Sequence, residues 1–364
     1  EVGNSYGRFM TTVTYPYDEQ TQSWTSTSSY PNTKLKPERT KSWEVGLDAR
    51  ILNDISLNLT YYRSNTYNQT FYADLSLSSG YSNIPIQSGN IMNEGLEMSL
   101  GYNKQWKDFS FNTNYTLTWN KNRVKRLADG VYNYATGQPI QMPELSPLTY
   151  GHTDARLILR VGGSMGDVYG QRLLKRDLNG YILNEEGVGL AMENKETYLG
   201  SILPKMNMGW SLGFGYKGVN LGMTFTGRFG GIVISETQSV LDAAGVSKVS
   251  ADVRDAGGVQ INQSKVSAQT YYQTIQGTAA YYTYSATNVR LGELSLSYTL
   301  PKKWFDNKVG MTVGLVGKNL WMIYCKAPFD PELTTSAASN FYQGFDAYML
   351  PSTRNFGFNV KFQF

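Results

Sequence analysis

The residue types that perform most enzyme chemistry are scarce in this sequence. The chain of 364 residues contains one histidine, His152, and one cysteine, Cys325. His152 lies close to Asp154, which could suggest an acid–base pair, but a histidine beside an aspartate in a loop is usually solvated surface. A single cysteine excludes an internal disulfide framework and a cysteine-based zinc site, and we expect Cys325 to be an inert small residue. We therefore expect no catalytic residues and no enzyme activity.

Two further segments have the residue types of ligand-binding loops. Residues 162–166 are rich in glycine, but they lack the Lys-Ser/Thr pair and the following helix pattern of a phosphate loop. Asp177, Asn179 and Gly180 resemble the start of a calcium loop, which needs oxygen ligands at alternate positions and a glycine at the turn. The acidic pair at 185–186 comes too early for the twelfth-position glutamate, so we interpret the segment as an Asn-Gly turn. We expect neither a metal ion nor another cofactor.

Aromatic side chains cluster in the irregular segments of the chain. Aromatic faces stack on sugar rings, and tyrosine offers amphipathic contact area at low entropic cost. The same composition suits contact with a partner protein or packing within a loop, so all three interpretations stay open. The candidate contact residues are Trp24, Tyr271, Tyr272, Tyr281, Tyr282, Phe341, Tyr342, Phe345 and Tyr348.

The elements that must position these residues show an alternation of period 2. In the last segment, every second residue from Phe356 to Phe364 is apolar and the intervening residues are polar or glycine. Such alternation places the two sets on opposite faces of a β-strand. Nine segments follow this rule, and the apolar phase changes near Gly292, where a β-bulge would restore the facing. The segments are 43–51, 55–61, 96–102, 109–119, 208–216, 219–225, 289–300, 309–315 and 356–364.

The connections between these strands alternate strictly between short and long. The short ones are 52–54, 104–108, 217–218 and 301–307, and the long ones are 66–93, 122–205, 230–287 and 322–353. This asymmetry is typical of an outer-membrane β-barrel with short periplasmic turns and long external loops. Such long loops are anomalous in a compact soluble domain. The sequence therefore predicts an all-β chain whose strands form a transmembrane antiparallel barrel.

The composition is consistent with this class. Charged residues make up 17% of the chain, below the roughly 25% of soluble domains, and no apolar run reaches the roughly 18 residues of a membrane helix. The net charge of +4 is spread along the chain without a basic block, so a nucleic-acid partner is not indicated.

Two predictions follow from the facing of the strands. Polar side chains opposite the apolar series should face the barrel lumen, where charge is tolerated better than on the lipid face. Phe364, the terminal aromatic residue, is the expected recognition signal for outer-membrane insertion. The predicted lumen-facing residues are Glu44, Asp48, Arg50, Asn112 and Asn114.

An odd number of strands cannot close a single-chain bacterial barrel, whose strand number is even. An open sheet in lipid would leave two unpaired edges with costly unsatisfied backbone groups. We therefore expect the missing strands to come from another polypeptide segment, unless residues 9–15 form a tenth strand.

Several motifs resemble, in order, those of the SusC/RagA family of TonB-dependent outer-membrane transporters. The first runs Leu-Lys-Pro-Glu-Arg-Thr-Lys-Ser-Trp-Glu-Val-Gly-Leu-Asp over residues 35–48. The second runs Ser-Gly-Asn-Ile-Met-Asn-Glu-Gly-Leu-Glu over 88–97, and the third runs Asn-Val-Arg-Leu-Gly-Glu-Leu-Ser-Leu-Ser-Tyr-Thr-Leu-Pro over 288–301. Gly-Lys-Asn-Leu-Trp at 317–321, Phe-Asp-Pro-Glu at 329–332 and Leu-Pro-Ser-Thr-Arg at 350–354 complete the series.

The resemblance implies a specific architecture and function. The complete protein would be a plugged barrel of about 22 strands in the bacterial outer membrane. Residues 1–364 would be its C-terminal nine or so strands, with the plug, the TonB box and the N-terminal strands outside this chain. The family imports oligosaccharides or oligopeptides with a SusD-like surface lipoprotein as lid and TonB as the energy source. We expect oligosaccharides, with oligopeptides, a passive porin and a His152-dependent outer-membrane enzyme as the alternatives.

Overall fold

The computed structural model describes residues 17–18, 23–24, 36–74, 83–127, 144–185, 189–261, 264–333, 335 and 340–364. The possible tenth strand at 9–15 lies outside these ranges, as does the side chain of Trp24. Within the described ranges, no helix is both long and apolar enough to span a bilayer.

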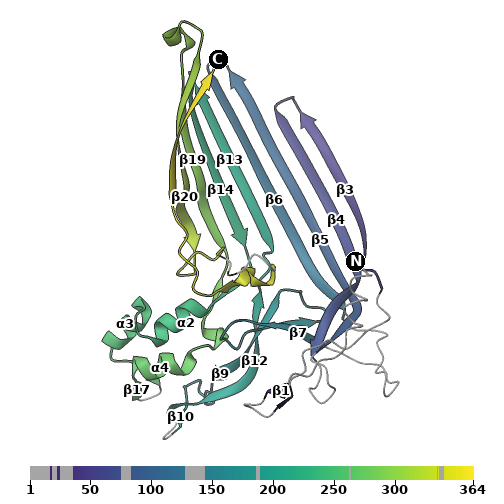
Figure 1. Ribbon diagram of the computed structural model, residues 1–364, viewed down its shortest axis with the longest axis vertical. Helices are drawn as coiled ribbons and strands as arrows, with labels where there is room; N and C mark the ends of the chain where they lie inside the picture. Colours follow the sequence, from purple (N-terminus) through teal and green to yellow (C-terminus); the bar gives the residue numbers. More distant parts are fainter. Residues whose placement is uncertain are drawn as a thin grey trace.

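The main element is a nine-stranded antiparallel sheet, which confirms the all-β prediction and its strand number. Its strand order is β22-β20-β19-β14-β13-β6-β5-β4-β3. Among these nine strands, each pair of neighbours in the sheet is therefore also consecutive in the sequence. Figure 1 shows these strands side by side, with the α-helices and the small sheets gathered at one end. The strands are β3 (Arg39–Ile51), β4 (Ile55–Asp74), β5 (Asn83–Trp106), β6 (Phe109–Arg126), β13 (Met206–Tyr216), β14 (Val219–Phe229), β19 (Asn288–Leu300), β20 (Gly310–Cys325) and β22 (Asn355–Gln363).

The pairing register gives the sheet one apolar and one polar face. Residues that pair directly across strands share a face, so each register row can be followed from edge to edge. One apolar row consists of Ile51, Ile55, Tyr102, Thr113, Leu212, Met223, Leu294, Gly317 and Phe356. The neighbouring polar row consists of Arg50, Ser56, Gly101, Asn114, Ser211, Thr224, Glu293, Lys318 and Asn355.

The apolar face is strongly exposed. Val45 is 67% exposed, Phe358 is 68% exposed and Phe356 is 80% exposed. A contiguous exposed apolar surface of this extent is costly in water and is the expected lipid-facing surface of a membrane barrel.

A bulge in β19 lies at the predicted position. Thr224 pairs with Glu293 while the next residue, Phe225, pairs with Leu291, so Gly292 is passed over. On the other side of β19, the register with β20 also shifts between Leu291 and Glu293. The extra residue places Arg290 and Asn288 on the polar face, as the change in apolar phase predicts.

The turns of the sheet need residues in the left-handed backbone region. Lys217 and Gly218 both have positive φ, 44° and 89°, as a two-residue type I′ hairpin requires. Leu52 and Asn53 in the β3–β4 turn also have positive φ. The β19–β20 connection contains η3 (Lys302–Phe305).

The end of the sheet opposite these short turns carries further secondary structure, formed by the long connections. We call it the loop layer (described residues within 144–201, 231–287 and 326–354). Its four-stranded sheet has the order β12-β9-β8-β7, and a three-stranded sheet has the order β18-β15-β21. These strands are β7 (Glu144–Thr149), β8 (Arg156–Arg160), β9 (Asp167–Leu174), β12 (Met192–Ser201), β15 (Ile232–Ser235), β18 (Thr283–Ser285) and β21 (Phe345–Asp346).

Three helices in the connection after β14 start at serine caps. They are α2 (Glu236–Ala243), α3 (Lys248–Asp255) and α4 (Ala268–Ile275), capped by Ser235, Ser247 and Ser267. Each serine hydroxyl accepts a hydrogen bond from a backbone N–H of the first turn, which satisfies one otherwise unpaired donor. The short elements are β1 (Tyr17–Asp18), β2 (Ser23–Trp24), β10 (Asn184–Glu185), β11 (Gly189–Leu190), β16 (Val259–Ile261), β17 (Ser264–Val266), η2 (Ala279–Tyr281) and η4 (Asn340–Gly344).

The prediction of a loop over 66–93 is wrong. β4 and β5 pair from Ile55–Tyr102 out to Asp74–Asn83, so most of that connection is a long hairpin. The register shifts twice between Tyr67 and Thr70, which interrupts the alternation that marks a strand in the sequence.

Candidate functional site

The five predicted lumen-facing residues share the polar face of the sheet. Glu44, Asp48 and Arg50 lie on β3, while Asn112 and Asn114 lie on β6. Three of them, Arg50, Asn112 and Asn114, line a shallow hollow of about 380 Å³ near the turn end of the sheet. Their facing comes directly from the register rows.

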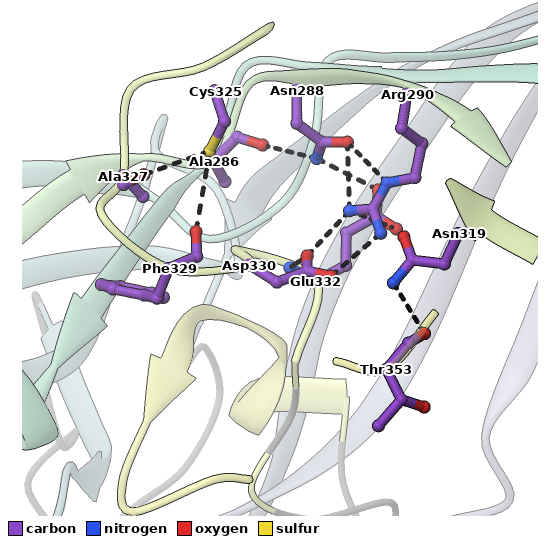
Figure 2. Close-up of polar contacts among 10 residues, drawn as sticks. All are labelled: Ala286, Asn288, Arg290, Asn319, Cys325, Ala327, Phe329, Asp330, Glu332 and Thr353. Atoms are coloured by element: carbon purple, nitrogen blue, oxygen red, sulfur yellow. Dashed lines mark hydrogen bonds and ion pairs between the residues drawn. The ribbon is translucent and has the colours of Figure 1, made fainter. Parts of the chain in front are cut away.

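A buried ionic cluster joins the loop end of this face to the last long loop (Figure 2). The Arg290 guanidinium forms a bidentate pair with Asp330, with Nη1–Oδ2 and Nη2–Oδ1 distances of 3.0 and 2.7 Å. Arg290 also donates to Asn288 Oδ1 from Nε and Nη2 at 3.3 and 3.2 Å, and lies 3.2 Å from Glu332. Only 11% of the Arg290 side chain and 8% of the Asp330 side chain are exposed. A planar guanidinium matched to a carboxylate fixes position and orientation together.

The surrounding polar groups complete the cluster. Asn288 Nδ2 donates to Ala286 O at 3.2 Å and to Glu332 Oε1 at 3.1 Å. Burial alone would raise the pKa of Asp330, but the hydrogen bonds from Arg290 and from the backbone of Glu332 hold it below its usual value. The Asp330 carboxylate is therefore charged at neutral pH, and the pair remains ionic.

The cluster brings distant sequence motifs together. Arg290 belongs to the motif at 288–301 and Asp330 to the motif at 329–332. Nearby, Asn319 from the motif at 317–321 donates to Thr353 O of the motif at 350–354 at 3.1 Å. Sequence reasoning missed this site, although a basic residue in one motif and two acidic residues in another were a usable signal.

Cys325, which we expected to be an inert small residue, lies at the edge of this cluster (Figure 2). Its thiol donates to the backbone oxygens of Ala327 and Phe329 at 3.4 and 3.7 Å. Those contacts help to turn the chain at the end of β20, where the last long loop begins.

A second hollow lies between the sheet and the loop layer, with a volume of about 530 Å³. Asn122 is at its base, where its Oδ1 accepts hydrogen bonds from Met165 N at 2.7 Å and Ser164 Oγ at 3.3 Å. Buried Asp167 accepts from Ser164 N at 2.8 Å and from Tyr198 Oη at 3.2 Å. The glycine-rich segment at 162–166 therefore acts as a turn held against the rim of the sheet.

Three of the predicted aromatic contact residues are buried inside the loop layer. Tyr272 and Tyr282 belong to one apolar cluster, and Phe345 belongs to the other. Burial, with the nearby Asp242 charge as a smaller cause, raises the pKa of Tyr282 far above its usual value. These side chains pack the loops and present little surface.

The other aromatic candidates of the loop layer are more accessible. Tyr348 is 59% exposed and donates from Oη to Glu236 Oε1 at 3.3 Å. Tyr271 and Tyr281 are partly buried, and the Tyr281 hydroxyl accepts from Leu174 N at 3.0 Å. Phe341 and Tyr342 are also partly buried, and both lie in η4.

The remaining positions singled out in the sequence are two aspartates that accept backbone hydrogen bonds and the exposed Phe364. Both carboxylate oxygens of Asp154 accept backbone N–H groups, and among the described residues no hydrogen bond joins it to the His152 side chain. The Asp177 Oδ1 accepts from Asn179 N and Tyr181 N at 2.8 and 2.9 Å, which forms a closed turn. Phe364 is 98% exposed directly after β22.

Comparison with known proteins gives a consistent result. The family model described as "TonB dependent receptor-like, beta-barrel" matches residues 3–320. TonB-dependent receptor P3 of Formosa agariphila is 26% identical over 365 residues, which cover 92% of this chain and 35% of that protein. TonB-dependent receptor SusC of Bacteroides thetaiotaomicron is 27% identical over 132 residues, which cover 35% of this chain and 12% of that protein.

The solved structure of the RagAB peptide importer in its open-open state has the same fold. It superimposes with a TM-score of 0.68 at 19% identity, covering 98% of this chain and 38% of that chain. The chain thus spans about a third of the length of the first relatives it matches. The family match over most of the sequence confirms the resemblance to SusC-like and RagA-like proteins, and the chain belongs to the TonB-dependent receptor-like β-barrel family.

Proposed function

We propose that this chain is part of the barrel wall of a bacterial outer-membrane transporter that imports nutrient oligomers, with oligosaccharides as the substrate class. The observation that carries the proposal is the nine-stranded sheet with one exposed apolar and one polar face, in a chain of this family. The apolar face suits lipid and the polar face suits a lumen. The two sheet edges, β3 and β22, are available for the remaining barrel strands.

The hydroxyl and amide side chains of the polar face suit a hydroxyl-rich substrate. One row of this face runs Asp48, Asn58, Ser99, Thr116, Gly209, Thr226 and Arg290. Hydroxyl and amide groups can each donate and accept hydrogen bonds, as a sugar hydroxyl requires of its partners. Recognition of this kind needs no covalent step by this chain.

Three partners complete the proposed transporter. A SusD-like surface lipoprotein forms the lid over the loop layer, and a plug segment closes the lumen. TonB supplies energy by acting on the N-terminal part of the full-length protein. The support for these partners is family membership and the solved RagAB assembly of the same fold.

The test uses the intact gene in its native bacterium. A deletion strain and the complemented strain are given fluorescent oligosaccharides of about six units, with fluorescent hexapeptides in a parallel arm. Uptake of the oligosaccharides is expected only with the gene present, and a proton uncoupler should abolish it. Gene-dependent uptake of the peptides alone would replace the proposed substrate class, and uptake that resists the uncoupler would indicate a passive pore.

A further inference from the structure

The apolar face of the sheet continues into a basic surface at its loop end. Above the row that contains Tyr61 and Trp119, the next row on the same face consists of Trp43, Arg63, Glu94 and Lys121. The following row consists of Lys41, Asn65, Met92 and Arg123, and the next of Arg39, Tyr67, Asn90 and Arg126. We call Arg39, Lys41, Arg63, Lys121 and Arg123 the basic rim.

The height of the basic rim matches the surface of a membrane. Eight residues separate Ile51 at the turn end from Trp43, which is about 26 Å along a strand at roughly 3.3 Å per residue. With a strand tilt of roughly 40°, this corresponds to about 20 Å along the membrane normal, close to the roughly 25 Å apolar band of an outer-membrane barrel. Trp43 and Tyr61, with ring centroids 5.5 Å apart, therefore lie at the interface, and the basic rim begins there.

Within the described residues, the basic rim has few acidic partners. Two of its rows contribute two basic residues each and the third contributes Arg39, while Glu94 is the acidic residue of these rows and lies 3.8 Å from Lys121. Lys41 lies 5.9 Å from the Tyr67 ring centroid. Arg63 and Arg123 form no hydrogen bond or ion pair within the part of the chain that the structure describes.

The turn end of the same face is organised differently. There Lys104 forms an ion pair with Asp54, and Lys217 lies 3.9 Å from Asp108. Two of the basic residues at that end thus have an acidic partner in the neighbouring turn. At the end that carries the loop layer (Figure 1), Arg63 and Arg123 have no such acidic partner among the described residues.

We infer that the basic rim binds phosphate-bearing lipid headgroups in the outer leaflet, an inference that rests on the proposed outer-membrane location. Arginine can bind phosphate oxygens through two parallel N–H groups, and lysine adds a point charge. The apolar rows below would contact the acyl chains of the same lipid while the aromatic residues contact the interface. The charge, the height and the continuity with the lipid-facing surface all favour a lipid over a soluble phosphate.

The test is a binding measurement on the full-length protein in a neutral detergent, with phosphatidic acid as the probe and phosphatidylcholine as the neutral reference. Native mass spectrometry gives the dissociation constant of each lipid. The test variant is Arg63→Gln/Lys121→Gln/Arg123→Gln. The matched control is Lys302→Gln/Lys303→Gln/Lys308→Gln, which removes three charges at the turn end, where all three residues are exposed.

We expect the test variant to bind phosphatidic acid about a hundredfold more weakly, since each basic residue near an anionic lipid surface contributes about fivefold. The control should stay within about twofold of the wild type, and phosphatidylcholine should not distinguish the three proteins. If the test variant does not fold, Arg63→Lys/Lys121→Arg/Arg123→Lys replaces it and should retain tight binding. Equal loss in test and control, or no loss in the test variant, would overturn the inference. Neither result depends on import or on TonB, so failure of the proposed function is recognised separately.

Discussion

Replacing Arg290 with methionine should release the start of the last long loop from the sheet. The change leaves the Asp330 carboxylate buried without its bidentate partner, while Glu332, at 38% side-chain exposure, can turn to water. Breaking a buried ion pair by removing one partner costs about 3–5 kcal/mol. Since 1.4 kcal/mol is a tenfold change in an equilibrium constant, local opening should become about a hundredfold to several thousandfold more frequent.

Hydrogen exchange measures this opening in the intact protein. Backbone amides in residues 326–333 should exchange faster in Arg290→Met by that factor. Amides near Phe345 should be little affected, because that part of the loop has its own anchor. There β21 pairs with β15, and Ser235 Oγ donates to Asp346 Oδ2 at 2.6 Å.

A second substitution separates the ion pair from simple loss of packing. In Arg290→Met/Asp330→Leu neither charge remains, and replacing a buried pair with apolar groups of similar size is often neutral. The double variant should therefore recover exchange close to that of the wild type. The reasoning is refuted if the single variant exchanges like the wild type, or if the double variant exchanges as fast as the single variant.

Three further predictions concern the faces, the loop layer and pH. Leu47→Lys, at mid-height on the apolar face, should lower the folding free energy measured in bilayers by about 2–4 kcal/mol. Thr60→Lys, on the polar face, should lower it by less than about 1 kcal/mol. Phe345→Ala should lower the free energy of unfolding of the loop layer by about 3–5 kcal/mol, because Phe345 fills a buried cluster with Tyr150. The loss is measured as faster proteolysis of the loop layer. The lowered pKa of Asp330 means that its contribution is complete above the ordinary value of 3.8 and is lost as pH falls through the folded pKa. Exchange at 326–333 should accelerate in that acid range, and Arg290→Met/Asp330→Leu, which lacks the carboxylate, should remove the dependence.

The sheet was predictable from the sequence because its signal is local. Alternation of period 2 needs only neighbouring residues, and the change of phase at Gly292 is visible within a single segment. The long connections carry no such signal. Leu157, Val168 and Ile202 are fully buried, but they meet Phe345 only after distant segments assemble. Their pattern therefore resembled that of surface loops.

The ionic cluster was hidden for the same reason. Forty residues separate Arg290 from Asp330 along the chain, and each motif alone is compatible with many roles. The burial that makes the pair strong arises from the packing of the last long loop against β19, which no single window of sequence contains. The aromatic candidates show the reverse problem, since exposure of Tyr348 and burial of Tyr282 could not be distinguished by residue type.

The bulge at Gly292 connects the two faces of the sheet with the position of the last loop. Side chains in a strand alternate strictly, so without one extra residue Arg290 would share the apolar face with Leu294 and Leu296. The register shift moves Arg290 to the polar face, in the row that begins at Asp48. The loop that Asp330 anchors is therefore held on the polar side of the wall. The apolar side stays clear of that loop, so a single inserted residue lets the same strand keep its apolar face and hold the loop on its polar face.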